Sequence, residues 1–131
     1  MTINERADLA VSLKATGKCN CTQAVLAAFE DKFDLSNEQL MTLGAGFAAG
    51  MGCMESTCGA LIGAVMTAGQ LTGAKGTPRY SKEILAKFNE KSGATICKDL
   101  KGITTGQVVC PCNDCVRNAV LALSEVCPIE E

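Results

Sequence analysis

The sequence predicts an all-α fold, a compact bundle of about five or six helices with an irregular, cysteine-bearing segment before the last helix. Apolar residues recur at helical spacing along successive stretches of the chain. The composition is 47% hydrophobic but only 4% aromatic, which favours a helical core of Ala, Leu, Val, Ile and Met over a β-sandwich. A length of 131 residues suits one domain with its own core, so residues 1–131 are expected to form a single domain.

The first helix is predicted from about Glu5 to Thr16. Asn4 is the expected N-cap, and Gly17 follows the last turn as a stop signal. Leu9 and Leu13 are four residues apart, so they share one face of this helix.

The second and third helices have clear start signals. The second begins near Asn20, and its apolar positions follow helical spacing: Cys21, Val25, Ala28, Phe29 and Phe33. Cys21 therefore lies in the first turn on the buried face. Ser36 and Gln39 form a capping-box signature for the third helix. Its predicted apolar positions are Leu40, Leu43, Phe47 and Met51.

The central stretch from Gln39 to Ala74 has one charged residue, Glu55. Its many glycines, its polar residues and the lack of flanking aromatic belts argue against a membrane span. We expect two buried helices, broken near Glu55–Thr57. The second of these runs from about Thr57 to Leu71 and places Cys58 in its first turn.

Two glycine pairs in this stretch have the spacing that allows helices to approach closely. They are Gly46 with Gly50 and Gly59 with Gly63. The Gly/Ala-rich helices fit two arrangements equally well, an intramolecular core or the seam of a homodimer.

The last third of the chain is predicted to hold two helices separated by an irregular segment. Ser81 is the expected cap of the fifth helix, and Gly93 ends it. The segment from Ala94 to Pro111 lacks periodicity and contains two cysteines and two glycines. Cys112 or Asn113 is the expected cap of the final helix.

Composition also limits the classes of function. The net charge of −2 gives no electrostatic reason to expect a nucleic-acid partner. The first ten residues include Glu5, Arg6 and Asp8 where a signal peptide needs an apolar stretch. We therefore expect a cytoplasmic protein. In a reducing compartment, nine cysteines indicate metal ligation or redox chemistry before structural disulfides.

Histidine is absent from the sequence. This excludes zinc sites that contain histidine, Cys–His nucleophile pairs and haem attachment through Cys-x-x-Cys-His. Hydrolase chemistry has little support, because Glu55 is the one acid in the central stretch and has no histidine to act with. Whether the protein is an enzyme stays open at this point.

The densest local signal is the run Cys110-Pro111-Cys112-Asn113-Asp114-Cys115, which combines Cys-x-Cys with Cys-x-x-Cys. Such spacings let neighbouring thiolates face one ion or cluster. For Cys115 there is an equally good alternative, a buried helical residue that packs as a small hydrophobe.

Three cysteines fall at predicted helix starts: Cys21, Cys58 and Cys112. Free N–H groups and the positive end of the helix dipole stabilise thiolate there. Cys97 lies in the irregular segment, where packing gives little reason for a cysteine. Cys53 could face the same site or simply pack. The alternative for the whole set is that each cysteine fills a small-residue position in the core.

Cys19 and Cys127 are judged peripheral and are not expected at the site.

The basic residues are concentrated in one stretch. Seven of the twelve lie between Lys75 and Lys101. The simpler interpretation of this basic stretch is a solvated helix face. The alternative is that it offsets an anionic cluster and docks an acidic electron-transfer partner.

The cysteine pattern resembles the redox-active protein family named for its C_GCAxxG_C_C motif. The resemblance rests on four separated stretches in the right order: Cys21-Thr22-Gln23-Ala24-Val25, Cys58-Gly59-Ala60-Leu61-Ile62-Gly63, Ile96-Cys97-Lys98-Asp99-Leu100 and Cys112-Asn113-Asp114-Cys115-Val116-Arg117. It implies that the family's shared cysteines correspond to Cys21, Cys58, Cys97 and Cys112. It also implies a small redox protein with a functional link to membrane transporters, and a similar module occurs in a cytochrome with an iron–sulfur site.

The sequence departs from the family pattern in two respects. The second motif reads Cys-Gly-Ala where the family label has Gly-Cys-Ala. Five further cysteines are present: Cys19, Cys53, Cys110, Cys115 and Cys127. Of these, Cys53, Cys110 and Cys115 are secondary candidates for the site.

Three functions follow from the sequence, in order of preference. The first is electron transfer through an iron–sulfur cluster bound by Cys21, Cys58, Cys97 and Cys112, with an unidentified electron donor or acceptor protein as partner. The second is a thiol–disulfide redox protein without cofactor, in which Cys112 cycles with Cys115 or Cys110 while Cys97 or Cys58 resolves. The third is a site for zinc or another soft metal.

Overall fold

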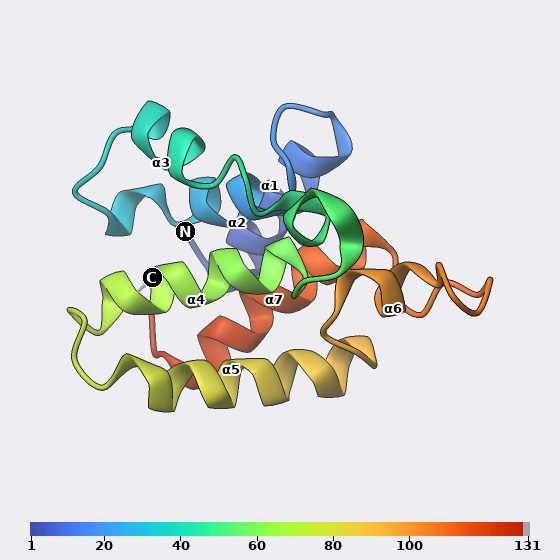
Figure 1. The fold of residues 1–131 in the computed structure, drawn as a ribbon. Coiled ribbons are helices and arrows are strands. Elements are labelled where there is room, and N and C mark those ends of the chain that lie inside the picture. The colour runs from blue at the N-terminus through green and yellow to red at the C-terminus, as the bar shows by residue number, and fades with distance from the viewer. Residues whose placement is uncertain (130–131) are drawn as a thin grey trace.

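Helices form the regular structure of residues 1–129, which the computed structural model describes (Figure 1). The α-helices are α1 (Ile3–Ala15), α2 (Cys21–Ala28), α3 (Asn37–Leu43), α4 (Gly59–Leu71), α5 (Thr77–Ser92), α6 (Cys97–Lys101) and α7 (Cys112–Val126). A 3₁₀ turn, η1 (Glu30–Lys32), and a π turn, η2 (Gly50–Met54), complete the set. The all-α prediction is confirmed. Seven α-helices in the described residues are slightly more than predicted.

Capping boxes fix the starts of the first three helices. Ser36 caps α3 as predicted, and Asn20, near which the second helix was expected to begin, caps α2. The predicted start of the first helix was wrong. Thr2 is the N-cap, because its hydroxyl accepts from the Glu5 N–H while the Glu5 carboxylate accepts from the Thr2 N–H. Asn4 therefore lies inside the first turn of α1.

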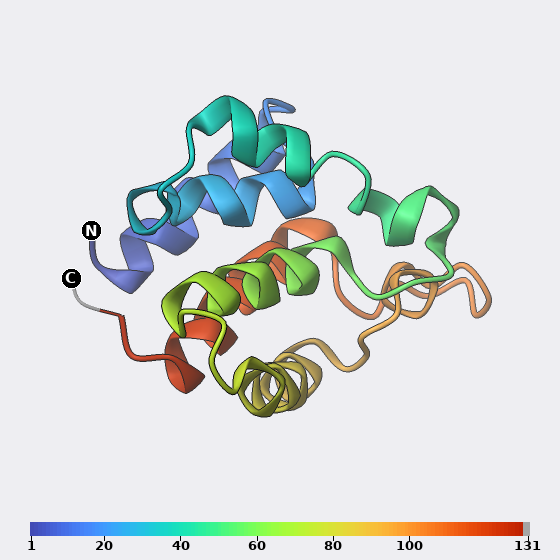
Figure 2. The ribbon, with the colours of Figure 1, turned by 60° about the vertical axis from the view of Figure 1, so that its left-hand side comes forward.

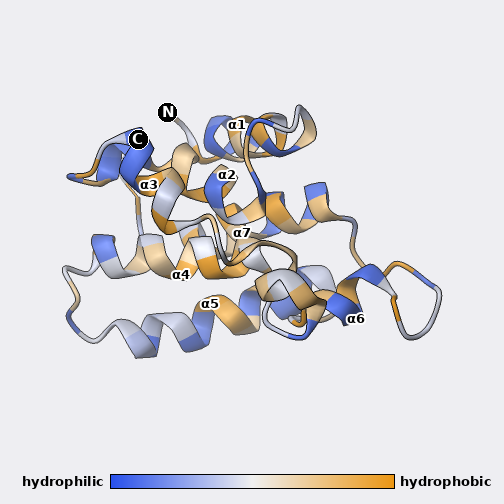
Figure 3. Ribbon diagram, turned by 45° about the horizontal axis from the view of Figure 1, so that its top comes forward, coloured by the Kyte–Doolittle hydropathy of each residue, from blue (hydrophilic) through white to orange (hydrophobic). Residues whose placement is uncertain are grey.

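The helices are arranged in layers around a shared core (Figure 2). Helix α2 packs between α1 and α4, and α7 contacts both α1 and α4. Helix α5 covers the outer side of α4 and α7, while α3 lies on α2. Helix α4 has no charged residue, and it is white to orange along most of its length in Figure 3. Its position in the middle layer accounts for this composition.

The core is built mainly from small and branched aliphatic side chains, as predicted. Alanines are prominent among the fully buried residues: Ala7, Ala10, Ala24, Ala60, Ala64, Ala68, Ala119 and Ala122. The expected methionines are not among the buried residues of the described chain, and Phe29 and Phe88 fill the larger spaces. Leu9 and Leu13 are only partly buried, because the alanine side of α1 is the one that packs closely against its neighbours.

Two glycines of α4 allow it to lie directly against α2. A methyl group at Gly59 would come within 2.6 Å of Thr22 Oγ1, and one at Gly63 would lie 3.0 Å from the Thr22 carbonyl oxygen. The Thr22 hydroxyl donates to the Gly59 carbonyl at 2.8 Å. The predicted close approach at Gly59 and Gly63 is thus a contact within the chain. A methyl group at Gly46, by contrast, would have no neighbour within 4 Å among the described residues.

The central stretch is less helical than predicted. Helix α3 ends at Leu43, so Phe47 and Met51 lie beyond it. The glycine-dense sequence that follows has low helix propensity, and the backbone instead turns left-handed from Ala49 through Gly52. In residues 1–129 no helix is long and apolar enough to cross a membrane.

The later helices also begin differently from the prediction. Helix α5 starts at Thr77, and Ser81 lies within it, donating its hydroxyl to the Thr77 carbonyl. The additional helix is α6, which lies inside the segment that was expected to be irregular. Pro111 is the N-cap of α7, so Cys112 is its first residue.

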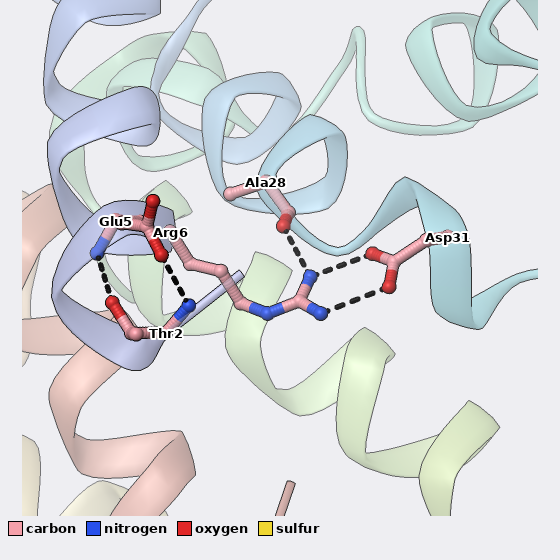
Figure 4. Close-up of polar contacts among 5 residues, drawn as sticks. All are labelled: Thr2, Glu5, Arg6, Ala28 and Asp31. Atoms are coloured by element: carbon pink, nitrogen blue, oxygen red, sulfur yellow. Dashed lines mark hydrogen bonds and ion pairs between the residues drawn. The ribbon is translucent and has the colours of Figure 1, made fainter. Parts of the chain in front are cut away.

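A buried arginine fastens α1 to the end of α2 (Figure 4). Arg6 is 1% exposed. Its Nη1 donates to the Ala28 carbonyl at 2.8 Å, and both terminal nitrogens contact the Asp31 carboxylate, at 2.6 and 2.9 Å. The guanidinium also lies 5.0 Å from the centre of the Phe29 ring. Hydrogen bonding from Arg6 lowers the pKa of Asp31 to about 2.

Candidate functional site

Two segments that are distant in sequence are tied together beside the start of α4. Thr57 and Ile96 form an isolated antiparallel bridge. The Cys58 N–H donates to the Thr95 carbonyl at 2.8 Å, and the Cys97 N–H donates to the Ser56 carbonyl at 3.0 Å. These bonds hold Cys58 and Cys97 side by side.

A second backbone tie brings the start of α7 to the same place. The N–H groups of Val109 and Cys110 both donate to the Leu100 carbonyl, at 2.9 and 3.1 Å. Leu100 is buried in α6, so this contact anchors the chain just before Cys112. The starts of α2, α4 and α7 and the whole of α6 consequently lie at one end of the bundle (Figures 1 and 2).

A cavity of about 150 Å³ lies where these segments meet. Its lining contains six of the nine cysteines: Cys21, Cys58, Cys97, Cys110, Cys112 and Cys115. The structure therefore brings together all four primary candidates, which are called the site cysteines below (Cys21, Cys58, Cys97 and Cys112). It adds two of the three secondary candidates.

The remaining three cysteines lie outside the cavity lining. Cys53 is exposed on the π turn, and its Sγ is 3.7 Å from the Gly50 carbonyl oxygen. Cys19 is only partly buried and contacts Met41, with 3.7 Å between the two sulfurs. Cys127 is buried just after the end of α7. Cys19 and Cys127 thus lie apart from the cavity, as expected.

Each of the site cysteines stands at a helix start. Cys21, Cys97 and Cys112 are the first residues of α2, α6 and α7, and Cys58 is the N-cap of α4. Three of these positions were predicted, and the fourth, Cys97, was expected in irregular backbone. Unpaired N–H groups at helix starts direct partial positive charge towards the sulfurs.

Cys58 is the thiol most easily ionised among those whose pKa is shifted. The neighbouring Cys115 thiol, acting as a hydrogen-bond donor, and the N–H groups of Leu61 and Ala60 lower the pKa of Cys58 to about 7, against the opposing effect of burial. Cys115 Sγ also lies 3.5 Å from the Cys110 carbonyl oxygen. Its hydrogen bond to Cys58 and its burial raise the pKa of Cys115. Of these two neighbouring sulfurs, Cys58 is thus the one that ionises more readily.

Cys21 and Cys97 are held in the neutral form by their surroundings. Burial raises the pKa of Cys21, with a further contribution from the nearby Cys58, although the Ala49 N–H donates to its sulfur and opposes this. Burial is also the largest cause of the raised pKa of Cys97. Simultaneous ionisation of these thiols therefore requires added positive charge, either from the protein or from a bound group.

The left-handed segment Ala49–Gly52 covers one side of the cavity. Ala49 lines it, and a methyl group on Gly50 would come within 2.7 Å of Cys97 Cβ. Two non-glycine residues here, Ala49 and Met51, have positive φ values of 55° and 62°. Such conformations cost about 1 to 3 kcal/mol each, so tertiary contacts at the cavity hold this backbone in place.

Two lysines also line the cavity, Lys14 from the last turn of α1 and Lys101 from the end of α6. Neither lysine was predicted from the sequence to lie at the site. For Lys101 a signal was present, since it lies four residues after Cys97 and would share a helix face with it. No comparable signal marked Lys14, Asn20 or Ala48, which line the cavity because of how distant segments pack.

The cysteines are all free thiols in this structure. Within residues 1–129, no three Cys, Asp or Glu side chains are gathered tightly enough to hold a single metal ion. The sulfurs instead surround a space, with helix starts on several sides of it.

A comparison with family models finds a match over residues 19–126, to the family C_GCAxxG_C_C, described as putative redox-active protein. The chain belongs to this family. The match spans most of the chain and includes all the site cysteines. No curated protein and no solved structure matches the chain.

Proposed function

We propose that this C_GCAxxG_C_C protein transfers electrons through an iron–sulfur cluster bound by the site cysteines. One observation carries the proposal: four cysteines from four separate helix starts line a single cavity. Thiolates are the usual protein ligands of such clusters, with four per cluster as the common number. A purely structural role for these residues would not require their convergence.

The dimensions and chemistry of the cavity support this assignment. A volume of about 150 Å³ equals that of an engineered protein cavity that accommodates benzene, so a group of several atoms fits where a single ion would leave space. The donors are thiols, and the N–H groups at the helix starts supply hydrogen bonds that tune the potential of such a centre.

Burial supports an electron-transfer role over metal storage. Cys21, Cys58 and Cys97 are at most 9% exposed and Cys112 is partly buried, so most of the ligands of a group held there would be shielded from solvent. A bound cluster would supply a one-electron couple. One electron would arrive from a donor protein and the same electron would leave to an acceptor protein, with no covalent bond of the chain broken.

The test is purification without oxygen, followed by a visible spectrum and counts of iron, sulfide and zinc per chain. The proposal predicts a brown protein with iron and acid-labile sulfide in equal amounts. A colourless preparation without iron and sulfide would refute it. Stoichiometric zinc in that preparation, with loss of the fold on chelation, would instead assign the cavity to a soft metal.

A second candidate function, thiol–disulfide exchange, is favoured by the pairing of Cys58 with Cys115. The Cys58 thiolate would attack a disulfide of a partner protein and release one partner thiolate. The Cys115 thiol would then lose its proton and attack Cys58 Sγ, releasing the second partner thiol. Two electrons and the Cys115 proton pass to the partner, whose first thiolate takes its proton from solvent, and a Cys58–Cys115 disulfide remains in the chain. This pair differs from the Cys112 pairs predicted from the sequence.

Mass spectrometry distinguishes this second function. The metal-free chain, equilibrated with a glutathione redox buffer, should lose two mass units, and peptide mapping should find Cys58 joined to Cys115. A Cys115→Ser variant should stop at the mixed disulfide with glutathione. If the chain instead keeps all nine thiols under oxidising buffer, disulfide exchange is excluded.

A further inference from the structure

We propose that Lys101 is a positioning residue that balances negative charge at the thiol cavity and thereby raises the reduction potential of the group bound there. This inference rests on the proposed redox function and assigns a role to a residue outside the cysteine motif. It is carried by the position of Lys101, by the absence of opposing charge in the cavity lining and by the contrast with Lys98 on the same helix.

Helix α6 directs Lys101 towards the cavity. The helix begins at Cys97 and has five residues, so Lys101 lies one turn after the cysteine on the same face. Leu100, between them, is 2% exposed and accepts two backbone hydrogen bonds from the segment before α7. These contacts fix the orientation of α6, and Lys101 lines the cavity while half-buried.

The charges that line the cavity are all positive. Lys14 and Lys101 are the charged members of the lining, and no carboxylate is among the described lining residues. Partial burial opposes the charge of Lys101, yet the pKa of Lys101 is raised because all of the site cysteines act on its ammonium. Lys101 is therefore close enough to interact with the whole site, and not with one thiol alone.

Lys101 has no carboxylate partner within residues 1–129. Lys98, one turn earlier, behaves differently: its Nζ lies 3.0 Å from Glu55 Oε2 and its side chain is 38% exposed. The charge of Lys98 is thus offset by a surface carboxylate and screened by solvent. Lys101 instead lines the cavity with the site cysteines, so the two lysines form a matched pair for comparison.

The direction of the effect follows from charge. Reduction adds negative charge to the site, whether an electron enters a cluster or a disulfide becomes two thiolates. A nearby cation stabilises the reduced form more than the oxidised form. Lys101 therefore favours reduction, and its removal should shift the equilibrium towards the oxidised form.

The experiment is a spectroscopically monitored redox titration of the anaerobically purified full chain and of the variants Lys101→Met, Lys101→Arg and Lys98→Met. We expect Lys101→Met to change the ratio of oxidised to reduced protein about tenfold towards oxidised at a fixed potential, equivalent to about 59 mV for one electron. Lys101→Arg should restore most of the change, because it keeps the charge. Lys98→Met should change the ratio less than twofold.

Iron and sulfide counts on each variant separate the possible failures. Loss of iron in Lys101→Met with retention in Lys101→Arg would also support a charge-balancing role. An unchanged ratio in Lys101→Met with normal iron content would overturn this inference alone and leave the proposed function standing. Equal shifts for Lys98→Met and Lys101→Met would overturn it as well. A wild-type chain with neither iron nor a reducible thiol pair would overturn both.

Discussion

The buried ionisable groups at the two ends of α2 differ in how they are partnered. At the end of the helix, Arg6 is 1% exposed, and its charge is matched within the chain by Asp31 and by the Ala28 carbonyl. At the start of the helix, called the thiol end below, the site cysteines line a cavity of about 150 Å³. Lys14 and Lys101 line the same cavity.

This is the difference expected between a charge that stabilises the fold and a site that binds a group. A buried charge that only stabilises the fold needs its partners permanently in place, because an unpaired buried ion is costly. A site that binds a redox group must leave room and unsatisfied donors for that group. At the Arg6 end, both terminal nitrogens of the guanidinium have partners, although Nε has none within residues 1–129. At the thiol end, under the proposed function, a bound group would supply the missing partners.

The largest effect is expected from filling the contact between α2 and α4 at the thiol end. Gly59→Ala would place a methyl group 2.5 Å from Cys21 Sγ, so α4 must shift and the cavity deform. We expect a loss of about 3 kcal/mol in unfolding free energy, measured by urea denaturation, together with loss of bound iron.

The matched control for Gly59→Ala is Gly69→Ala in the same helix. A methyl group there has no neighbour within 4 Å, and alanine has higher helix propensity than glycine, so the variant should be about 0.5 to 1 kcal/mol more stable. Equal stability of the two variants would show that the close contact at Gly59 does not constrain the site.

A smaller loss is expected at the opposite end of α2. Arg6→Met removes the hydrogen bonds to Ala28 and Asp31 while keeping much of the side-chain volume, and should cost about 2 kcal/mol by thermal unfolding. The iron content should stay at the wild-type level. As a control, Arg117→Met breaks the exposed ion pair with Asp8 and should change stability by less than about 0.5 kcal/mol. A drop in iron for Arg6→Met would show that the two ends are coupled.

The smallest effect concerns acid stability. Asp31 has a pKa of about 2 in the folded chain against an ordinary value of 3.8. Its contribution is therefore complete above pH 4 and is lost as the pH falls from 4 towards 2. Because the Asp31 side chain is 57% exposed, solvent screening limits this contribution to about 1 kcal/mol or less. Asp31→Asn should flatten the stability profile between pH 4 and 2, and an unchanged profile would contradict the assignment.

Much of the thiol end could be predicted from the sequence because its signals are local. Asn20 marks the start of α2 by its side chain, and glycine after an apolar run marks helix ends. Cysteines placed just after such start signals therefore pointed to Cys21, Cys58 and Cys112. Cys97 was singled out because it lies in a segment that lacks periodicity, where packing gives little reason for a cysteine. Its helix was missed because five residues are too few to produce a periodic pattern.

The features that were missed depend on tertiary contacts. An arginine in a sequence is predicted to be exposed, because arginine is rarely buried without a partner. Arg6 can be buried because Asp31 lies close to it. The left-handed backbone at Ala49 is fixed by packing against the cavity, whereas local propensity gave no sign of it. Lys14 reaches the cavity only because α1 and α2 lie side by side.

The central claim is tested most directly by comparing two cysteine variants of the anaerobically purified protein. Cys97→Ser removes a site cysteine that lines the cavity, whereas Cys127→Ser alters a cysteine that is equally buried but lies outside its lining. The measurement is iron and sulfide per folded chain. The account predicts that Cys97→Ser loses most of both while Cys127→Ser keeps the wild-type content. Equal content in the two variants would contradict it.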